Sequence, residues 1–243
     1  MTHLVTAIRY LTIVPVPGRG HEAAPGPAAV WFPIVGLAIG GVLVGVDYVA
    51  TALFAPLLAA LVTVTAWKLL TGGLHLDGLA DCLDGLMGRD AAHRLAIMRD
   101  SRIGAFGAIG LVLFLMLELG AVSGIDARAR MHALLLAPVA GRAVAPLVAR
   151  VFPAPGGGHG AGFRASVSAP VAALALAIAA VVAVVALRGW GVLALALATA
   201  LALAVGAFMT RRLGGVSGDV HGAAVELAEL TVLLTIAAAY PAR

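Results

Sequence analysis

Long apolar segments separated by short polar ones dominate the chain. A helix that crosses a bilayer needs roughly 20 mainly apolar residues, and such runs predict seven crossings, at approximately 31–50, 53–70, 104–122, 131–150, 169–187, 190–209 and 223–241. In the first 17 residues Leu4, Ile8 and Leu11 recur at helical spacing, which predicts an amphipathic helix lying in the membrane interface. The pattern therefore predicts an all-α, polytopic bundle of about seven transmembrane helices plus an N-terminal interfacial helix, as one integral-membrane domain over 1–243.

Composition supports a membrane protein. The 243 residues are 62% hydrophobic and only 12% charged, with a mean hydropathy of +1.05, whereas soluble domains carry roughly 25% charged residues. The net charge of +4 is better explained by arginines in cytoplasmic loops than by nucleic-acid binding, so no nucleic-acid partner is expected. The single cysteine, Cys82, excludes an intramolecular disulfide framework.

Arginine is unequally divided between the two sides that seven crossings define. The N-terminal segment and the loops near 72–103, 151–168 and 210–222 lie on one side and carry nine arginines, against four on the other. Positive charge concentrates in cytoplasmic loops. The first side is therefore expected to be cytoplasmic.

The stretch TGGLHLDGLADCLDGLMGRD concentrates the scarce acids of this chain. If 76–88 is helical, Asp77, Asp81 and Asp84 share one face, where like charges repel. A divalent cation would compensate them, and Mg²⁺ prefers carboxylate oxygens together with substrate phosphates. His75 could be a general base or a substrate contact, although a regular helix points it away from the carboxylates. The alternative is a solvated acidic face without function.

Two further polar segments are predicted on the same side. RLAIMRDSRIGAFG offers arginines that grip phosphate and an aspartate, Asp100, that could complete a metal shell; its alternative role is a basic anchor for lipid headgroups. RRLGGVSGDVHGAAVELAEL carries Asp219, which could belong to the site or simply cap the next helix. It also carries Glu226 and Glu229 at the beginning of a crossing, where carboxylates need a partner or a function. Asp47 and Glu118 are isolated and receive no role.

Two known families have motifs similar to these segments. DCLDGLMGR matches the first half of the motif of CDP-alcohol phosphotransferases, but Met98, Arg102 and Phe106 stand where its glycine and remaining aspartates belong. The three polar segments quoted above, with RYLTIVPVP and WFPIVGLAIGG near the start, resemble instead the cobalamin synthase (adenosylcobinamide-GDP ribazoletransferase) family in order and over nearly the whole chain. The Gly141-Arg142 pair resembles the short polar interruption in the fourth crossing of that family.

The resemblance implies a transferase of the bacterial cytoplasmic membrane that acts in cobalamin biosynthesis. It would join adenosylcobinamide-GDP to α-ribazole, or its 5′-phosphate, release GMP and require Mg²⁺. A carboxylate or His75 would take the proton from the ribazole 5′-hydroxyl. The expected site residues are catalytic His75, Asp81 and Asp100; metal-binding Asp77, Asp81, Asp84 and Asp100; and substrate- or phosphate-binding Arg94, Arg99, Arg102, Arg142, Arg211, Asp219 and Glu226.

Two matters stay open at this point. A homo-oligomer is compatible with the sequence. An ion-coupled transporter is the alternative from another functional class, with Asp77, Asp81, Glu226 and Glu229 along the ion path and HLDGLAD in a broken, re-entrant helix.

Overall fold

A computed structural model describes residues 2–16, 25–155 and 159–242. Within these ranges the chain is helical and has no β-strand beyond an isolated bridge between Ile125 and Pro241. In chain order the elements are α1 (Thr2–Leu11), the 3₁₀ helix η1 (Pro27–Trp31), α2 (Phe32–Leu53), α3 (Pro56–Leu70), α4 (Leu74–Gly85), α5 (Ala91–Met98), α6 (Ala105–Gly124), α7 (Ala127–Val151), α8 (His159–Ser166), α9 (Ala169–Leu213) and α10 (Gly218–Ala239).

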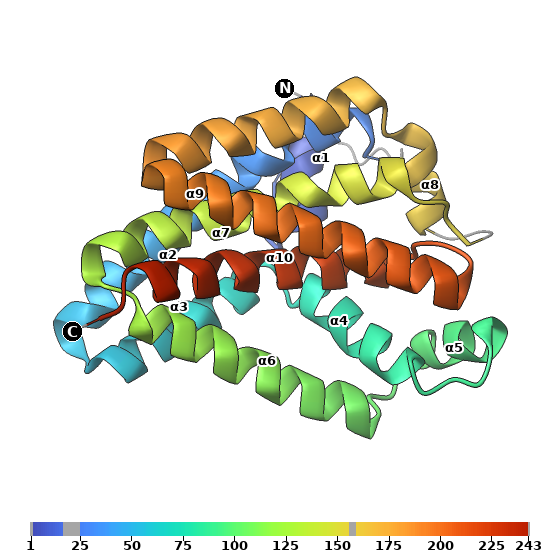
Figure 1. The fold of residues 1–243 in the computed structure, drawn as a ribbon, viewed down its shortest axis with the longest axis horizontal. Helices are drawn as coiled ribbons and strands as arrows, with labels where there is room; N and C mark the ends of the chain where they lie inside the picture. The colour runs from blue at the N-terminus through green and yellow to red at the C-terminus, as the bar shows by residue number, and fades with distance from the viewer. Residues whose placement is uncertain (1, 17–24, 156–158, 243) are drawn as a thin grey trace.

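The long helices run side by side along one axis, and their connections collect at two opposite ends (Figure 1). One end, called the aspartate end below, contains α4, α5 and α8, the starts of α6 and α10, and the ends of α7 and α9. The other, called the hairpin end, contains the α2–α3 and α6–α7 connections, the turn within α9 and the C-terminal end of α10. This separation confirms the predicted grouping of the loops at 72–103, 151–168 and 210–222.

Helix α9 is two helices that fold back on each other. Arg188 interrupts its 45 residues with a non-helical backbone, φ 50° and ψ −128°, and the two arms lie antiparallel in Figure 1. The arms cover 169–187 and 189–213, so the hairpin predicted from 169–187 and 190–209 is confirmed.

The number of crossings depends on how two bent elements are counted. By length and composition five helices of the described chain can cross a bilayer when α9 is counted once, or six if α3 and α4, bent by 90°, form one broken crossing. The two arms of α9 add one more to these six, which gives the predicted seven. The membrane bundle is therefore multi-pass.

Close helix contacts in the bundle depend on small residues. Helix α7 lies at the centre, packed against α2, α9 and α10. A methyl group on Gly36 would lie 2.5 Å from the carbonyl oxygen of Pro138, and one on Gly40 would lie 2.8 Å from that of Leu134. Glycine at these positions therefore lets α2 approach the backbone of α7, as expected for helices in lipid.

Helix α1 packs beside the first crossing. Ala7 and Leu11 are buried, and Tyr10 stacks on Phe32 and Phe163, with ring centroids 5.7 and 6.0 Å away. The N-terminal helix predicted from the spacing of apolar residues is thus present and shorter than the 17 residues expected.

Candidate active site

A sharp turn separates α4 from α3. Gly72 and Gly73 both have positive φ, 64° and 67°, a conformation that is unfavourable for residues with a Cβ. The consecutive glycines after Thr71 therefore allow the chain to bend by 90° and to begin a second helix at once. The TGG at the start of the acidic segment is the local cause of the bend.

Helix α4 packs directly on the first turns of α10. A methyl group on Gly78 would lie 2.7 Å from the backbone oxygen of Asp219, and one on Gly222 would lie 3.0 Å from that of His75. Each helix therefore places a glycine against the backbone of the other. This contact brings the carboxylates of α4 to the start of α10, which the sequence had separated by more than 130 residues.

Asp77, Asp81 and Asp219 form what we call the aspartate face. Asp77 is exposed, and Asp81 and Asp219 are partly buried. The like charges of Asp77 and Asp219 both act on Asp81. None of the three forms an ion pair within the described part of the chain, so their mutual repulsion is balanced only by more distant charge, such as that of Arg99 on Asp219.

Asp84 has a different environment from the other two aspartates of α4. Its Oδ2 accepts a hydrogen bond from the Gly104 N–H at 2.7 Å, and its Oδ1 accepts one from the Gly107 N–H at 2.8 Å. These donors belong to the first turn of α6, where backbone N–H groups lack partners inside the helix. Asp84 thus fastens α4 to α6, a role that its place on the acidic stripe did not indicate.

Asp219 is not the cap of α10. The cap is Ser217, whose side chain accepts from the Val220 N–H, and Asp219 lies in the first turn, with its Oδ2 3.3 Å from Ser217 Oγ. The alternative use of Asp219 as a simple N-cap is therefore wrong. Its charge acts on Asp81 of α4.

The arginines of the α5 region lie at the same end as this face, and the charge of Arg99 acts on Asp219. Arg94 donates to the Arg212 carbonyl oxygen at 3.3 Å, which ties α5 to the end of α9. Arg102 donates two hydrogen bonds to Asp100 through Nε and Nη2, at 3.0 and 2.7 Å, and these bonds lower the pKa of Asp100 to about 2. Asp100 is thus paired with an exposed arginine. Arg99 and Arg211 are exposed on the same end.

A cavity of about 530 Å³ adjoins the aspartate face. Asp77, Gly72 and Gly73 line it together with Tyr10 and Thr12 from the N-terminal segment. The cavity is a space next to the carboxylate of Asp77 that a substrate could enter.

A second group of charges is buried inside the bundle. Lys68 Nζ lies 2.9 Å from Glu118 Oε1 and 2.6 Å from Glu226 Oε2, and Arg142 pairs with Glu229. All three glutamates and Arg142 are at most 2% exposed. Arg142 and Glu226, expected to bind substrate or phosphate, therefore lie in what we call the buried charge network.

Single charged residues in apolar helices are the sequence feature that indicates this network. Lys68 and Glu118 stand alone in their apolar helices, and charges inside a crossing normally pair with one another. Summing the charges within the predicted crossings sets Lys68, Arg142 and Arg150 against Asp47, Glu118, Glu226 and Glu229. The structure also pairs Asp47 with Arg130, which stands just before the predicted crossing at 131–150; Asp47 Oδ2 and Arg130 Nε are 3.0 Å apart near the hairpin end.

His75 lies near the buried charge network. It is 7% exposed and faces α10 through Gly222, and the charges of Arg142 and Lys68 act on it. Its Nδ1 has no hydrogen-bond partner in the described structure. The expectation that His75 points away from the carboxylates of α4 agrees with this buried position.

The aspartate face and the three buried glutamates differ in how they could bind a metal cation. Among the described residues, only Glu118, Glu226 and Glu229 bring three carboxylate oxygens within 4.8 Å of one another, but Lys68 and Arg142 already supply positive charge there. The expected set of Asp77, Asp81, Asp84 and Asp100 does not converge to that degree. Asp77, Asp81 and Asp219 do not converge to that degree either. They are, however, oxygen donors without a cationic partner, the ligand type that Mg²⁺ prefers together with phosphate.

Known proteins are similar to this chain over nearly its whole length. The family model described as cobalamin-5-phosphate synthase matches residues 3–237. Proteins named adenosylcobinamide-GDP ribazoletransferase are similar: one from Roseiflexus sp. (strain RS-1) is 42% identical over 98% of this chain and 90% of its own length. Another from Herpetosiphon aurantiacus is 41% identical over 97% and 96%, and one from Brevibacillus brevis is 34% identical over 97% and 98%. No solved structure matches the chain.

Proposed function

The chain belongs to the cobalamin-5-phosphate synthase family, and on this premise we propose that it joins adenosylcobinamide-GDP to α-ribazole or α-ribazole 5′-phosphate. Family membership makes it a membrane enzyme that transfers phosphate-containing groups during assembly of the cobalamin nucleotide loop. The proposal adds the two substrates, the release of GMP and a dependence on Mg²⁺.

The observation that carries the proposal is the unpaired aspartate face. Elsewhere in the described bundle the buried acids Glu118, Glu226, Glu229 and Asp47 each have a cationic partner. Asp77, Asp81 and Asp219 have none; Asp77 lines a cavity, and the charge of Arg99 acts on Asp219. Repelling carboxylates left without a partner at an accessible surface are typical of a site completed by cation and substrate.

The proposed transfer breaks one phosphorus–oxygen bond of the diphosphate and forms another. A ribazole hydroxyl attacks the phosphorus on the cobinamide side, the oxygen that bridges the two phosphates leaves with GMP, and the hydroxyl proton passes to a base. The attacking group is not the 5′-hydroxyl when the acceptor is the 5′-phosphate, because that oxygen already carries a phosphate.

We assign the base to Asp81 rather than to His75. Asp81 is partly exposed on the aspartate face, whereas the buried His75 is held against α10. A general base must lie within hydrogen-bond reach of the proton that it removes. Arg94, Arg99, Arg102 and Arg211 would bind phosphate oxygens, because guanidinium groups donate to them in pairs.

Mg²⁺ belongs to the proposal as the partner of the aspartate face. Asp77 and Asp81, with Asp219 from α10, would hold the ion, and Asp84 would keep α4 in place through its bonds to Gly104 and Gly107. When bound, the ion would neutralise charge on the diphosphate and on the departing GMP.

We further propose that the aspartate end faces the cytoplasm of a bacterial cell. Eight described arginines lie at this end, namely Arg89, Arg94, Arg99, Arg102, Arg150, Arg164, Arg211 and Arg212, against Arg128, Arg130 and Arg188 at the hairpin end. The native Cys82 is buried, so a cysteine placed at Arg89 or Arg128 can be labelled selectively. An impermeant maleimide added to intact spheroplasts should label Arg128→Cys and spare Arg89→Cys; the reverse pattern would contradict the orientation.

The test of the function is GMP release by the purified protein in liposomes, given adenosylcobinamide-GDP and α-ribazole. We expect release with formation of adenosylcobalamin in Mg²⁺, loss of both with EDTA, and loss of both in Asp81→Asn at unchanged stability. Full turnover by Asp81→Asn would refute the assigned site. No turnover by well-folded protein would refute the substrates, and CDP-alcohol donors would be tested next.

A further inference from the structure

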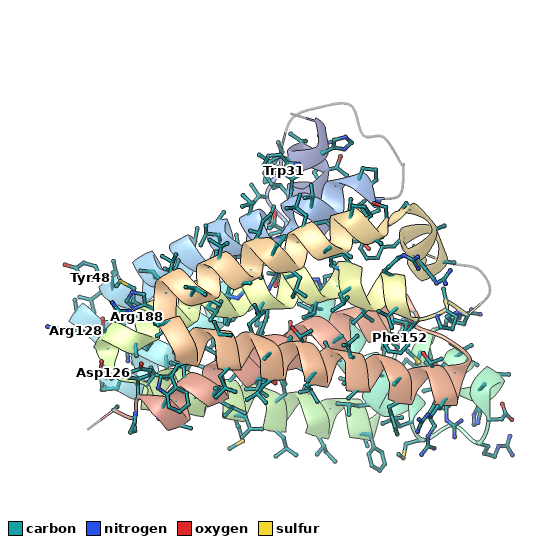
Figure 2. All side chains as sticks on the ribbon, turned by 45° about the horizontal axis from the view of Figure 1, so that its top comes forward. Trp31, Tyr48, Asp126, Arg128, Phe152 and Arg188 are labelled. Carbon is teal, nitrogen blue, oxygen red and sulfur yellow. The ribbon has the colours of Figure 1, made fainter. Side chains whose placement is uncertain are left out.

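A cavity of about 810 Å³ opens at the hairpin end, away from the aspartate face. It lies between the start of α7, the turn of α9 and the end of α10, and its polar lining includes Asp126, Arg128, His132 and Arg188. Figure 2 shows the labelled side chains of Asp126, Arg128 and Arg188 together at this end of the bundle. The proposed transfer uses none of these residues.

Positive charge is concentrated in this cavity although the end as a whole is poor in it. Of the three arginines described at the hairpin end, Arg130 is paired with Asp47, and the other two, Arg128 and Arg188, line the cavity. Neither of these two guanidinium groups has a hydrogen bond or ion pair in the described part of the chain. Two unpaired cations at one cavity are suited to an anion.

The backbone of Arg188 adds a second, independent observation. Its φ of 50° and ψ of −128° belong to the first central position of a type II′ turn, where glycine is the usual residue. It is the one non-glycine residue with positive φ among those described, and the neighbouring glycine, Gly189, does not take up that position. This conformation is strained for a residue with a side chain, so an arginine at this position indicates a use for its side chain.

The remaining polar groups of the cavity are compatible with an anion. Asp126 caps α7 by accepting from the Arg128 N–H at 3.0 Å, so its charge is engaged at a helix N-terminus, where anions are favoured. His132 Nδ1 is 2.8 Å from the Arg128 carbonyl oxygen and leaves Nε2 for a ligand. With one carboxylate and two guanidinium groups, the cavity carries a net positive charge.

The apolar part of the lining favours a lipid over a soluble anion. Val185 is 79% exposed, Trp190 45% and Leu193 42%, and all three line the cavity from the arms of α9. Acyl chains can cover such side chains, and tryptophan is typical of the level of the headgroups. A soluble phosphate would leave this surface uncovered.

We propose that the hairpin-end cavity binds the phosphodiester headgroup of an anionic phospholipid, with Arg188 and Arg128 as its ligands. The lipid stabilises the α9 turn against the start of α7 and the end of α10. The contact between the Arg188 side chain and the bound phosphate compensates for the strain of the Arg188 backbone.

The experiment measures the unfolding temperature of the purified protein in neutral detergent, with phosphatidylglycerol, phosphatidylcholine or inorganic phosphate added. Phosphatidylglycerol at about 100 times its Kd should raise the midpoint of the unmodified protein by about 5 °C or more, and the other two additives should not. Arg188→Gly relieves the backbone, so its midpoint without lipid should be unchanged or higher, while the shift with phosphatidylglycerol should fall by more than half.

Arg128→Gln and Arg150→Gln form a matched pair at the two ends of α7. Only the first should reduce the lipid shift. An unchanged shift in both Arg188→Gly and Arg128→Gln, or an equal shift with phosphatidylcholine, would overturn the proposal. An equal shift with inorganic phosphate would overturn the assignment to lipid. None of these outcomes depends on transfer activity, so the inference stands or fails apart from the proposed function.

Discussion

Lys68 is the residue whose replacement tests the buried charge network most severely. It is the cation for two carboxylates, at 2.9 Å from Glu118 and 2.6 Å from Glu226. With an effective dielectric constant near 20, each contact represents about 6 kcal/mol of Coulomb attraction, and desolvation of the three ions offsets most of the sum. Lys68→Met leaves two buried carboxylates without a partner, which typically costs about 3–5 kcal/mol.

Unfolding in mixed micelles with increasing sodium dodecyl sulfate, followed by circular dichroism, measures this loss. Leu69→Met, an exposed neighbour on α3, is the control and should change the unfolding free energy by less than about 0.5 kcal/mol. The combined replacement of Lys68, Glu118 and Glu226 by methionine removes the charges together and should regain most of the stability.

Two results would refute the reasoning. One is a Lys68→Met protein as stable as the Leu69→Met control. The other is a triple variant no more stable than Lys68→Met, because the loss would then come from packing rather than from unpaired charge.

Three further outcomes follow from the contacts of α4. Gly78→Ala places a methyl group 2.7 Å from the Asp219 backbone, so it should lower the unfolding free energy by about 1–3 kcal/mol and remove most of the transfer activity. Gly41→Ala is the control, because its added methyl has no atom within 4 Å, and it should change neither quantity. Equal effects of the two substitutions would contradict the close contact. Asp84→Asn should lower the unfolding free energy by about 1–3 kcal/mol through loss of a hydrogen bond at the start of α6. Asp81→Asn should leave the unfolding free energy unchanged and abolish transfer. A stability loss in Asp81→Asn and not in Asp84→Asn would contradict the roles assigned to these two residues. Removal of divalent metal should stop transfer without lowering the unfolding temperature by more than about 2 °C, since the aspartate face lies at the surface, and a larger fall would indicate a structural metal.

The helices were predictable where the apolar pattern had clear ends. The break of α9 at Arg188 was placed correctly because a charged residue beside glycine interrupts two long apolar runs. The last crossing begins at Gly218 instead of 223 because its first turns contain Asp219 and His221, whose polarity masked a helix buried by α4. The sequence predicted the 90° bend after α3 only as an alternative, in which HLDGLAD belongs to a broken, re-entrant helix.

The site was only partly predictable, because a helix pattern does not give partners across the bundle. The shared face of Asp77 and Asp81 follows from spacing alone, but their approach to Asp219 depends on Gly78 and Gly222. Asp84 has the same spacing and yet binds backbone donors of α6 that begin 20 residues later.

The central claim is that the aspartate face, and not the buried charge network, holds the metal. Electron paramagnetic resonance of Mn²⁺, used in place of Mg²⁺, can count ions bound to the purified protein in the presence of adenosylcobinamide-GDP. We predict that Asp81→Asn loses the bound Mn²⁺ and that Glu118→Gln retains it. Retention by Asp81→Asn with loss in a folded Glu118→Gln protein would place the metal among Glu118, Glu226 and Glu229 and contradict the account.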